Sequence, residues 1–530
     1  MIQAINPILS GFYPDPSICR VGEDYYLVNS SFAYFPGVPI WHSKNLADWQ
    51  QVGNILDRNS QVPLHKSGHS GGIFAPTIRY HDGIYYMITT NISGGGNFIV
   101  TATKPEEPWS EPYFLGGEAQ GIDPSLFIDE DGTCYYVGTR PNPEGVRYNG
   151  DWEIWVQKLD LVTMRLIGKS YAIWKGALKD VIWPEGPHLY KKDDYYYLMI
   201  AEGGTGPNHA VTVARSNDVI GPYVNNPNNP ILTHRHLGKD YPIIYVGHAD
   251  LVDDINGNWY MVMLASRRCE GYVGLGRETF LAKVVWEDGW PVVNPGVGML
   301  EDIVELPFDG TSPQPRDIQT LKNFNKDDDA ANPDVVMLRN PKEKFYTNIN
   351  GTVRLNFLPK TLKELESPAY LGFRQLEYNY EAVLDMEFDR LSDTEEAGLV
   401  ILQSNEYHML LRMKKQMDSE ADNITLQVVK CLKLEEHLLA EKCLYTNELK
   451  RNKEADKLGL KIKIKAYGQK ADFIQVMEEC EVPLLENVDI HEMSTEIAGG
   501  FVGNTIGVYA SSCGEPSENF IDIKDFTIRY

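Results

Sequence analysis

Hydrophobic and polar positions alternate in a pattern that recurs five times within the first 270 residues. Each copy has a small turn, a hydrophobic run, a polar turn and an aromatic-rich run, as in 13–28, 74–87, 122–137, 183–198 and 247–261. Polar dipeptides such as Asp82-Gly83 between two such runs are typical of β-hairpins, because a tight turn needs a positive φ at its centre. Tyrosines and β-branched residues on both sides favour strands over helices. The pattern therefore predicts a chain of hairpins.

The spacing of the copies predicts how the hairpins are arranged. Equivalent positions are Asp15, Ala75, Asp123, Glu185 and His248, at intervals of 60, 48, 62 and 63 residues. Such intervals suit a four-stranded sheet with its loops, and five such sheets arranged radially form a β-propeller with a central channel. A long β-sandwich fits less well, because sandwich strands need not repeat one motif so regularly. We predict a five-bladed β-propeller over residues 1–305.

The pattern changes after the fifth copy. Prolines and a run of aspartates predict a linker, which we place at 306–325. Residues 382–388 and 458–464 then alternate with a period of two, which is typical of sheets with one buried and one solvated face. We predict an antiparallel β-sandwich over 326–530, and hence an all-β protein. The stretch 435–453 fits either a helix or a strand.

Charge and composition narrow the classes of partner. The formal net charge is −25, which disfavours binding to nucleic acids or anionic lipid surfaces. No apolar run approaches the roughly 20 residues that a membrane helix needs. The seven cysteines are odd in number and scattered, which fits a reducing compartment. With no recognisable signal peptide at the N-terminus, we expect a cytoplasmic location.

Three of the five equivalent positions carry acids: Asp15, Asp123 and Glu185. The innermost strands of a propeller start at one mouth of the channel, so these carboxylates should converge there. An aspartate before proline also caps turns, but Ala75 makes the same turn without a carboxylate, which favours a functional reading. Metal chelation fits less well, since the ring holds one histidine and no HExxH motif occurs. Glycoside hydrolysis needs one protonated acid and one opposing carboxylate, and a third carboxylate would raise the pKa of the acid.

Seven segments of the first 300 residues resemble glycoside hydrolase family 43, most closely its two-domain β-xylosidase and α-L-arabinofuranosidase branch. The segments are 6–18, 30–38, 72–76, 121–125, 183–187, 202–206 and 274–279. The resemblance implies a five-bladed propeller, a following β-sandwich and an inverting reaction. It implies that Asp15 is the general base, Glu185 the general acid, and Asp123 the residue that tunes the pKa of the acid and holds it in place. Inversion requires the base and the acid to stand about 6.5–9.5 Å apart.

The same resemblance implies a pocket for one terminal sugar. Arg277 would bind sugar hydroxyls and hold Asp123 ionised. Phe32 and Phe74 would form a wall, although many relatives have Trp in the place of Phe74. Thr205 and Ala75 would line the pocket.

The resemblance also suggests roles for His248 and Phe501. His248 resembles a channel histidine that lies beside a water-coordinated calcium ion in several family members, whereas a lone histidine is more often structural. We therefore expect no cofactor for the chemistry and keep a structural calcium ion as an open alternative. Phe501, within 499–503, is the candidate for a sandwich loop that closes the pocket, and a core strand of the sandwich is the alternative. Relatives in this branch often form dimers or tetramers, which makes a homo-oligomer an expectation.

The expected activity is that of an exo-acting, inverting β-xylosidase that releases xylose from the non-reducing ends of xylo-oligosaccharides. An α-L-arabinofuranosidase, or a bifunctional enzyme acting on arabinoxylan fragments, is the nearest alternative, because the two pentoses present similarly placed hydroxyls. A retaining transferase or fructosidase and a carbohydrate-binding propeller without turnover are the more distant alternatives.

Overall fold

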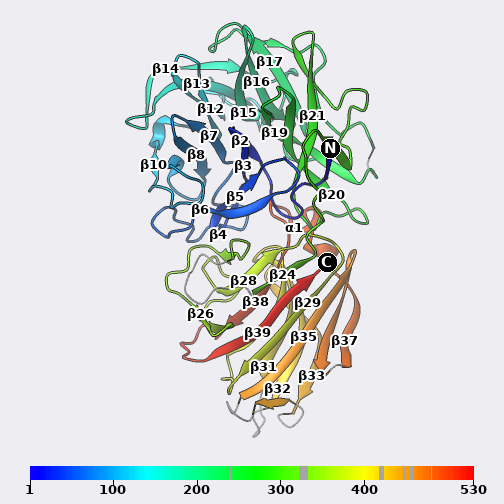
Figure 1. Ribbon diagram of the computed structural model, residues 1–530. Coiled ribbons are helices and arrows are strands. Elements are labelled where there is room, and N and C mark those ends of the chain that lie inside the picture. The colour runs from blue at the N-terminus through cyan, green and yellow to red at the C-terminus, as the bar shows by residue number, and fades with distance from the viewer. Residues whose placement is uncertain (239, 322–331, 417–422, 446–448, 453–456, 479) are drawn as a thin grey trace.

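The computed structural model describes residues 1–530 apart from 239, 322–331, 417–422, 446–448, 453–456 and 479. Two β-domains lie one above the other, and the short helix α1 (Thr495–Ala498) lies where they meet (Figure 1). Two 3-10 turns, η1 (Gly116–Glu118) and η3 (His491–Met493), are the other helical elements described here. None of the helices among the described residues is long and apolar enough to cross a membrane.

The N-terminal domain consists of five four-stranded antiparallel sheets, which confirms the predicted five-bladed propeller. The first blade holds β2 (Ser17–Val21), β3 (Asp24–Val28), β5 (Gly37–Ser43) and β6 (Gln50–Leu56), and the second holds β7 (Thr77–His81), β8 (Ile84–Asn91), β9 (Gly96–Ala102) and β10 (Tyr113–Phe114). The third holds β11 (Ile122–Ile128), β12 (Cys134–Pro141), β13 (Trp152–Asp160) and β14 (Arg165–Trp174), and the fourth holds β15 (Glu185–Lys192), β16 (Tyr195–Glu202), β17 (Ala210–Ser216) and β18 (Val224–Asn225). The fifth holds β19 (Ile243–Asp253), β20 (Trp259–Arg267), β21 (Glu278–Glu287) and β22 (Trp290–Val293). The innermost strands β2, β7, β11, β15 and β19 contact one another around the channel. Each repeat of the sequence therefore contributes one inner strand to a common ring.

A separate pair of strands joins the beginning and the end of the propeller sequence. β1 (Ile2–Ile5) pairs with β23 (Ile303–Leu306), and the Asn6 amide donates hydrogen bonds to Leu281 O and Glu301 O at 2.8 Å each. Because these residues lie about 300 positions apart, the pairing ties the two ends of the ring together.

The C-terminal domain contains a nine-stranded and a six-stranded antiparallel sheet. The larger sheet holds β26 (Tyr346–Ile349), β27 (Thr352–Asn356), β39 (Phe520–Arg529), β29 (Tyr380–Phe388), β35 (Lys457–Tyr467), β36 (Lys470–Met477) and β37 (Cys480–Asp489), with β24 (Ile318–Thr320) on β39 and β34 (Lys450–Asn452) on β35. The smaller sheet holds β28 (Ala369–Arg374), β38 (Thr505–Ser511), β30 (Glu396–Leu402), β31 (Tyr407–Lys415), β32 (Ile424–Leu432) and β33 (Glu435–Leu444). Of the two alternatives for 435–453, the strand is therefore the one observed at Glu435–Leu444.

The range 306–325, which the sequence predicts as a linker, is not wholly irregular. Its residues Ile318–Thr320 form β24, which pairs with Thr527–Arg529 of the last strand. The prolines at 307, 313 and 315 break the preceding segment, because proline supplies no backbone N–H to a sheet. Beyond them the chain can pair again, so the sandwich begins inside the predicted linker.

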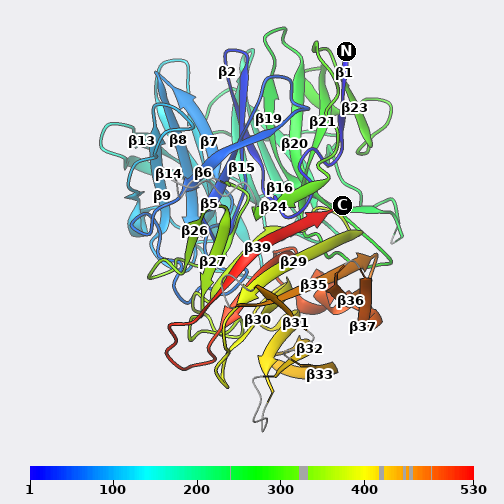
Figure 2. The same cartoon turned by 60° about the horizontal axis from the view of Figure 1, so that its bottom comes forward.

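The two domains share apolar packing at their junction. The strand β25 (Met337–Leu338), which follows the linker, pairs with β4 (Tyr34–Phe35) of the propeller. Phe12 and Phe32 from the propeller pack in one buried cluster with Tyr370 and Val502 from the sandwich. Figure 2 shows the same junction from another side, with the C-terminal strand β39 reaching it. All seven cysteines are free thiols, so burial and strand pairing hold the domains together.

Candidate active site

The acidic residues at the channel mouth sit in irregular backbone at the start of the inner strands. Asp15, Asp123 and His248 have positive φ values of 53°, 51° and 47°, in the left-handed region that non-glycine residues rarely adopt. The register of β11 shifts between Ile122 and Ser125, and the register of β19 shifts on both sides of Gly247. Bulges of this kind re-aim side chains next to active sites. The same left-handed backbone conformation thus directs all three side chains into the channel mouth.

In the fourth blade this ring position belongs to Gly186, which corrects the sequence alignment by one residue. The register of β15 shifts between Glu185 and His188, so Gly186 stands where Asp123 stands in the third blade. Gly186 has a φ of 56°, and a Cβ built there would lie 2.9 Å from the His248 ring. Glycine is needed because a Cβ would collide with the His248 ring, whereas Asp15 and Asp123 adopt a similar backbone angle with a side chain. Glu185 enters the pocket from the residue just before the turn.

Asp15 lies in an environment that favours its ionised form. The Arg277 guanidinium donates a hydrogen bond to Asp15 Oδ1 at 2.8 Å, and the Ser30 hydroxyl donates to Oδ2 at 2.5 Å. Burial by itself would raise the pKa of Asp15, but the charge of Arg277, followed by contributions from His248 and Ser30, holds the pKa below its ordinary value. Asp15 is therefore a carboxylate near neutral pH, as a general base must be.

Glu185 has the opposite protonation preference. Burial raises its pKa well above the ordinary value, and the negative charges of Asp123 and then Asp15 raise it further. Burial also raises the pKa of Asp123 to about 6, while its Oδ2 accepts a hydrogen bond from Gly186 N at 3.1 Å. Because that amide directly follows Glu185, Asp123 both repels the ionised acid and fixes the backbone that carries it. Two carboxyl groups with pKa values pushed apart are typical of an acid and base pair.

The structure gathers every residue predicted for the site into one pocket of about 470 Å³. These are Asp15, Phe32, Phe74, Ala75, Asp123, Glu185, Thr205, His248, Arg277 and Phe501. Six further residues line it that the sequence reasoning did not select: Ile122, Ile182, Trp183, Gly203, Gly204 and Gly206. Trp183 and the glycines lie in segments 183–187 and 202–206, whose unusual composition was the available signal. Ile122 lies in segment 121–125, and only Ile182 falls outside these segments.

The direct partner of Arg277 corrects one expectation. The resemblance implies that Arg277 holds Asp123 ionised, whereas Arg277 forms its ion pair with Asp15. The Arg277 charge does lower the pKa of Asp123, but less than burial raises it. Arg277 Nε is buried and has no hydrogen-bond partner among the described residues, so one donor is left over inside the site.

Phe501 belongs to a sandwich loop that forms part of the pocket wall. Its ring stacks with Phe32 at 6.1 Å between centroids and meets Phe74 edge-on at the same distance. The Arg277 guanidinium lies 5.5 Å from the centroid of the Phe501 ring. The segment follows α1 as a loop, so the alternative of a core strand is wrong. The resulting wall of three aromatic rings suits the apolar face of a sugar.

Hydrogen bonds hold this loop against the propeller. Phe501 N donates to the Ser70 hydroxyl at 2.8 Å, and Asn504 N donates to Gly274 O at 2.9 Å. Gly500 has a φ of 80°, and a Cβ there would lie 2.3 Å from Ser70 Oγ. The close approach therefore requires glycine at position 500 and sets the depth of the aromatic wall.

A buried charge network fills the channel below the pocket. Both carboxylate oxygens of Asp250 accept hydrogen bonds from Arg79, and the same carboxylate accepts from Ser17 and Tyr190. His188 accepts a bond from Arg79 at 2.9 Å through a ring nitrogen. These residues come from inner strands of blades one, two, four and five. The network thus links the inner strands of four of the five blades to one another.

The surroundings of His248 do not fit a directly coordinated calcium ion. Calcium takes six to eight oxygen ligands, as a general rule. His248 Nδ1 lies 3.9 Å from Asp15 Oδ1, and both oxygens of Asp15 already have donors. Among the described residues, the one cluster of metal-ligating side chains close enough together for an ion does not include His248. A calcium ion held through water molecules stays a prediction.

Comparisons with known proteins agree with this geometry. A family model described as glycosyl hydrolases family 43 matches residues 4–291, and a model described as a beta xylosidase C-terminal concanavalin A-like domain matches 322–529. The chain belongs to glycosyl hydrolase family 43. It is a glycoside hydrolase of the branch with two domains, as the sequence motifs predict.

Individual relatives span the whole chain. A xylosidase/arabinosidase from Butyrivibrio fibrisolvens is 55% identical over 100% of this chain and 99% of its own length. A non-reducing end alpha-L-arabinofuranosidase from Bacteroides ovatus is 36% identical over 99% of this chain and 94% of its own length. The crystal structure of a xylan beta-1,4-xylosidase from Bacillus halodurans is similar with a TM-score of 0.89 and 31% identity, covering 99% of this chain and 100% of that one. The family 43 architecture therefore extends over both domains.

Proposed function

We propose that this family 43 enzyme is an exo-acting β-xylosidase that inverts the anomeric configuration and also accepts α-L-arabinofuranosides. The observation that carries the mechanism is the opposite protonation of two buried acids in one pocket: Asp15 is held ionised by Arg277, and Glu185 is held protonated by burial and neighbouring carboxylates. Asp15 would take a proton from a water molecule as that water attacks the anomeric carbon. Glu185 would donate its proton to the departing oxygen.

The shape of the pocket supports cleavage at a chain end. The sandwich loop brings Phe501 against Phe32 and Phe74, which places an apolar wall on one side of the sugar. The Arg277 guanidinium lies over the Phe32 and Phe501 rings, and its Nε, which has no partner among the described residues, is a donor that we assign to a sugar hydroxyl. A wall contributed by a second domain limits how far a saccharide chain can continue past the terminal residue.

Acceptance of two pentoses rests on the pocket and on the relatives. Xylopyranose and arabinofuranose place their hydroxyls similarly, and the full-length relative at 55% identity is named a xylosidase/arabinosidase. Xylo-oligosaccharides and arabinoxylan fragments are accordingly the proposed substrates. Such neutral substrates suit a chain with a net charge of −25.

The test compares rates on aryl β-D-xylopyranoside and aryl α-L-arabinofuranoside. Asp15→Ala and Glu185→Ala should each lower the rate by about 10²–10⁴-fold or more while the fold is retained, because each removes a proton-transfer group. Proton NMR of the first product should show the inverted anomer. Absence of activity on both glycosides would refute the pentosidase assignment, and a product of retained configuration would refute the roles of Asp15 and Glu185. A carbohydrate-binding propeller without turnover would show binding and no rate at all.

Three other expectations remain part of this proposal. No metal ion takes part in the proposed chemistry, and prolonged treatment with EDTA tests for the structural calcium ion: an unchanged rate would count against that ion. A homo-oligomer is expected by resemblance, and analytical ultracentrifugation would measure it. A cytoplasmic location is proposed because the odd, scattered cysteines suit a reducing compartment, and cell fractionation would test it.

A further inference from the structure

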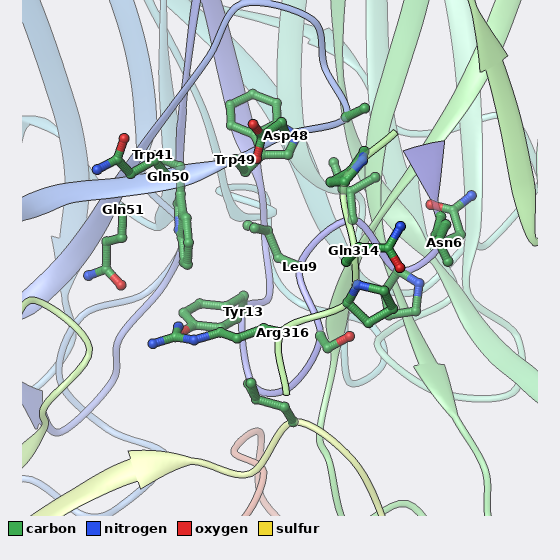
Figure 3. Close-up of a pocket in the computed structure, with 18 of the residues that line it drawn as sticks. Asn6, Leu9, Tyr13, Trp41, Asp48, Trp49, Gln50, Gln51, Gln314 and Arg316 are labelled. Carbon is green, nitrogen blue, oxygen red and sulfur yellow. The ribbon is translucent and has the colours of Figure 1, made fainter. Parts of the chain in front are cut away.

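A second cavity, of about 440 Å³, lies at the junction of the two domains. Its lining comes from propeller residues 5–10 and 47–51, from the segment 313–316, and from sandwich residues 376–377. Trp41 and Gln51 lie on one side of the view in Figure 3, with Gln314 and Asn6 on the other. Its volume falls in the range of small-ligand sites. None of its lining residues lines the catalytic pocket.

Aromatic rings form one part of the cavity wall. Tyr13 and Trp41 are buried and pack edge to face, with 5.0 Å between ring centroids. Trp49 is half-buried, and its indole N–H donates to Leu46 O at 3.0 Å, which fixes the orientation of the ring. Rings held in this way offer apolar surface at little cost in side-chain entropy.

Four of the lining side chains carry a buried polar atom that has no hydrogen-bond partner within the described structure. They are Tyr13 OH, Trp41 Nε1, Gln51 Oε1 and Asp334 Oδ1. Buried polar groups are nearly always hydrogen-bonded to protein or to ordered water, so this concentration marks a cavity where water or a ligand supplies the partners. The same signature occurs in the catalytic pocket, at Arg277 Nε.

The charged residues of the cavity are largely compensated. Arg267 donates to Glu278 and Glu377, and Arg316 pairs with Asp334. Since these cations already have anionic partners, the cavity offers little attraction to a phosphate or carboxylate ligand. The net charge of −25 also disfavours an anion. A neutral ligand with several hydroxyl groups suits this lining, because it can pack on the aromatic rings and form hydrogen bonds with the amides and the unpaired polar atoms.

We propose that this cavity is a second saccharide-binding site, which takes a neutral sugar unit and is distinct from the catalytic pocket. Hydroxyl groups both donate and accept, so one sugar can serve the unpaired donors of Tyr13 and Trp41 and the acceptor of Gln51. The bound sugar would contact both domains and stabilise the junction by mass action. Tyr13 also lies two residues before Asp15, and its backbone N–H donates to Arg277 O at 3.1 Å.

The test uses the full chain labelled with 5-fluorotryptophan, because the two pockets contain different tryptophans. Trp183 reports the catalytic pocket, whereas Trp41 and Trp49 report the junction cavity. Fluorine resonances are assigned with single Trp→Phe variants. Xylobiose is titrated into the Glu185→Gln variant, which cannot hydrolyse it. We expect the Trp49 resonance to shift with its own dissociation constant, different from that of Trp183.

Gln50→Phe supplies the blocking variant, since Gln50 is exposed and lines only the junction cavity. The matched control is Gln157→Phe in β13, which lines neither pocket. Gln50→Phe should abolish the Trp49 shift and leave that of Trp183, and the control should leave both. A shift of Trp183 alone, or a Trp49 shift that follows the Trp183 curve and survives Gln50→Phe, overturns the second site. A shift of Trp49 without Trp183 supports the second site and contradicts the proposed catalytic function, so the two proposals fail separately.

Discussion

Arg277→Met should move the acidic limb of the pH–rate profile to higher pH. The substitution keeps most of the side-chain volume and removes the charge that lies 2.8 Å from Asp15 Oδ1. In the native site this charge, acting against burial, lowers the pKa of Asp15. Without it, burial dominates and the pKa rises above its ordinary value. The base would then stay protonated, and so inactive, up to a higher pH.

The size of the shift follows from the ion pair. Two charges centred about 4 Å apart interact by about 4 kcal/mol at an effective dielectric constant of about 20. Since one pKa unit corresponds to about 1.36 kcal/mol, the full effect is about 3 units, and we expect an observed shift of about 1–3 units after solvent relaxation. The free energy of unfolding should also be lower in the variant than in the native protein at neutral pH. In the native protein the ion pair adds to the free energy of unfolding above the ordinary pKa of aspartate, and this contribution is lost as the pH falls through the lowered pKa of Asp15. In the variant the pKa of Asp15 is raised, so the free energy of unfolding falls further below the native value as the pH rises.

The assay is kcat/KM for an aryl β-D-xylopyranoside across the pH range, with urea unfolding at two pH values. Ser30→Ala is the matched control, because it removes a hydrogen bond of 2.5 Å from an uncharged donor to the same carboxylate. It should shift the limb in the same direction by less than Arg277→Met does, because Ser30 lowers the pKa of Asp15 less than Arg277. A fall in kcat/KM with an unmoved acidic limb would show that Arg277 binds substrate without controlling Asp15.

Three further outcomes are expected. Asp123→Asn should move the basic limb of kcat/KM to lower pH, because removing the negative charge lowers the pKa of Glu185; an unmoved basic limb would contradict this. Ser70→Ala should raise KM more than it lowers kcat, by up to about 10-fold, since one hydrogen bond of about 0.5–1.5 kcal/mol positions the Phe501 loop; a change confined to kcat would refute a role in shaping the pocket. Arg79→Met should lower the free energy of unfolding by about 3–5 kcal/mol in urea titrations, because it leaves a buried carboxylate unpaired; a loss below about 1 kcal/mol would contradict the proposed fastening of the blades.

Local sequence patterns were sufficient for the propeller and for the residues that gather in its pocket. Hairpin turns and alternating strands depend on residues close together in the chain, so a repeat at regular intervals reports both the blade and its inner strand. Asp15 and Asp123 were recognisable because each begins the same repeated turn. The exact place of Glu185 was not, because the bulge that puts Gly186 at the ring position becomes visible only when strand register is known.

Contacts between distant segments were decided by the tertiary structure alone. The pairing of Arg277 with Asp15 rather than Asp123, and the bond between Phe501 and Ser70, join residues more than 250 positions apart. No local pattern encodes such a partner, because it depends on how the ring closes and how the sandwich docks. The shifts in the pKa values of the acids also depend on the tertiary structure, since burial and neighbouring charges arise only when the chain folds. The sequence by itself thus singled out the carboxyl groups that we propose to react, and packing decided which of them is ionised.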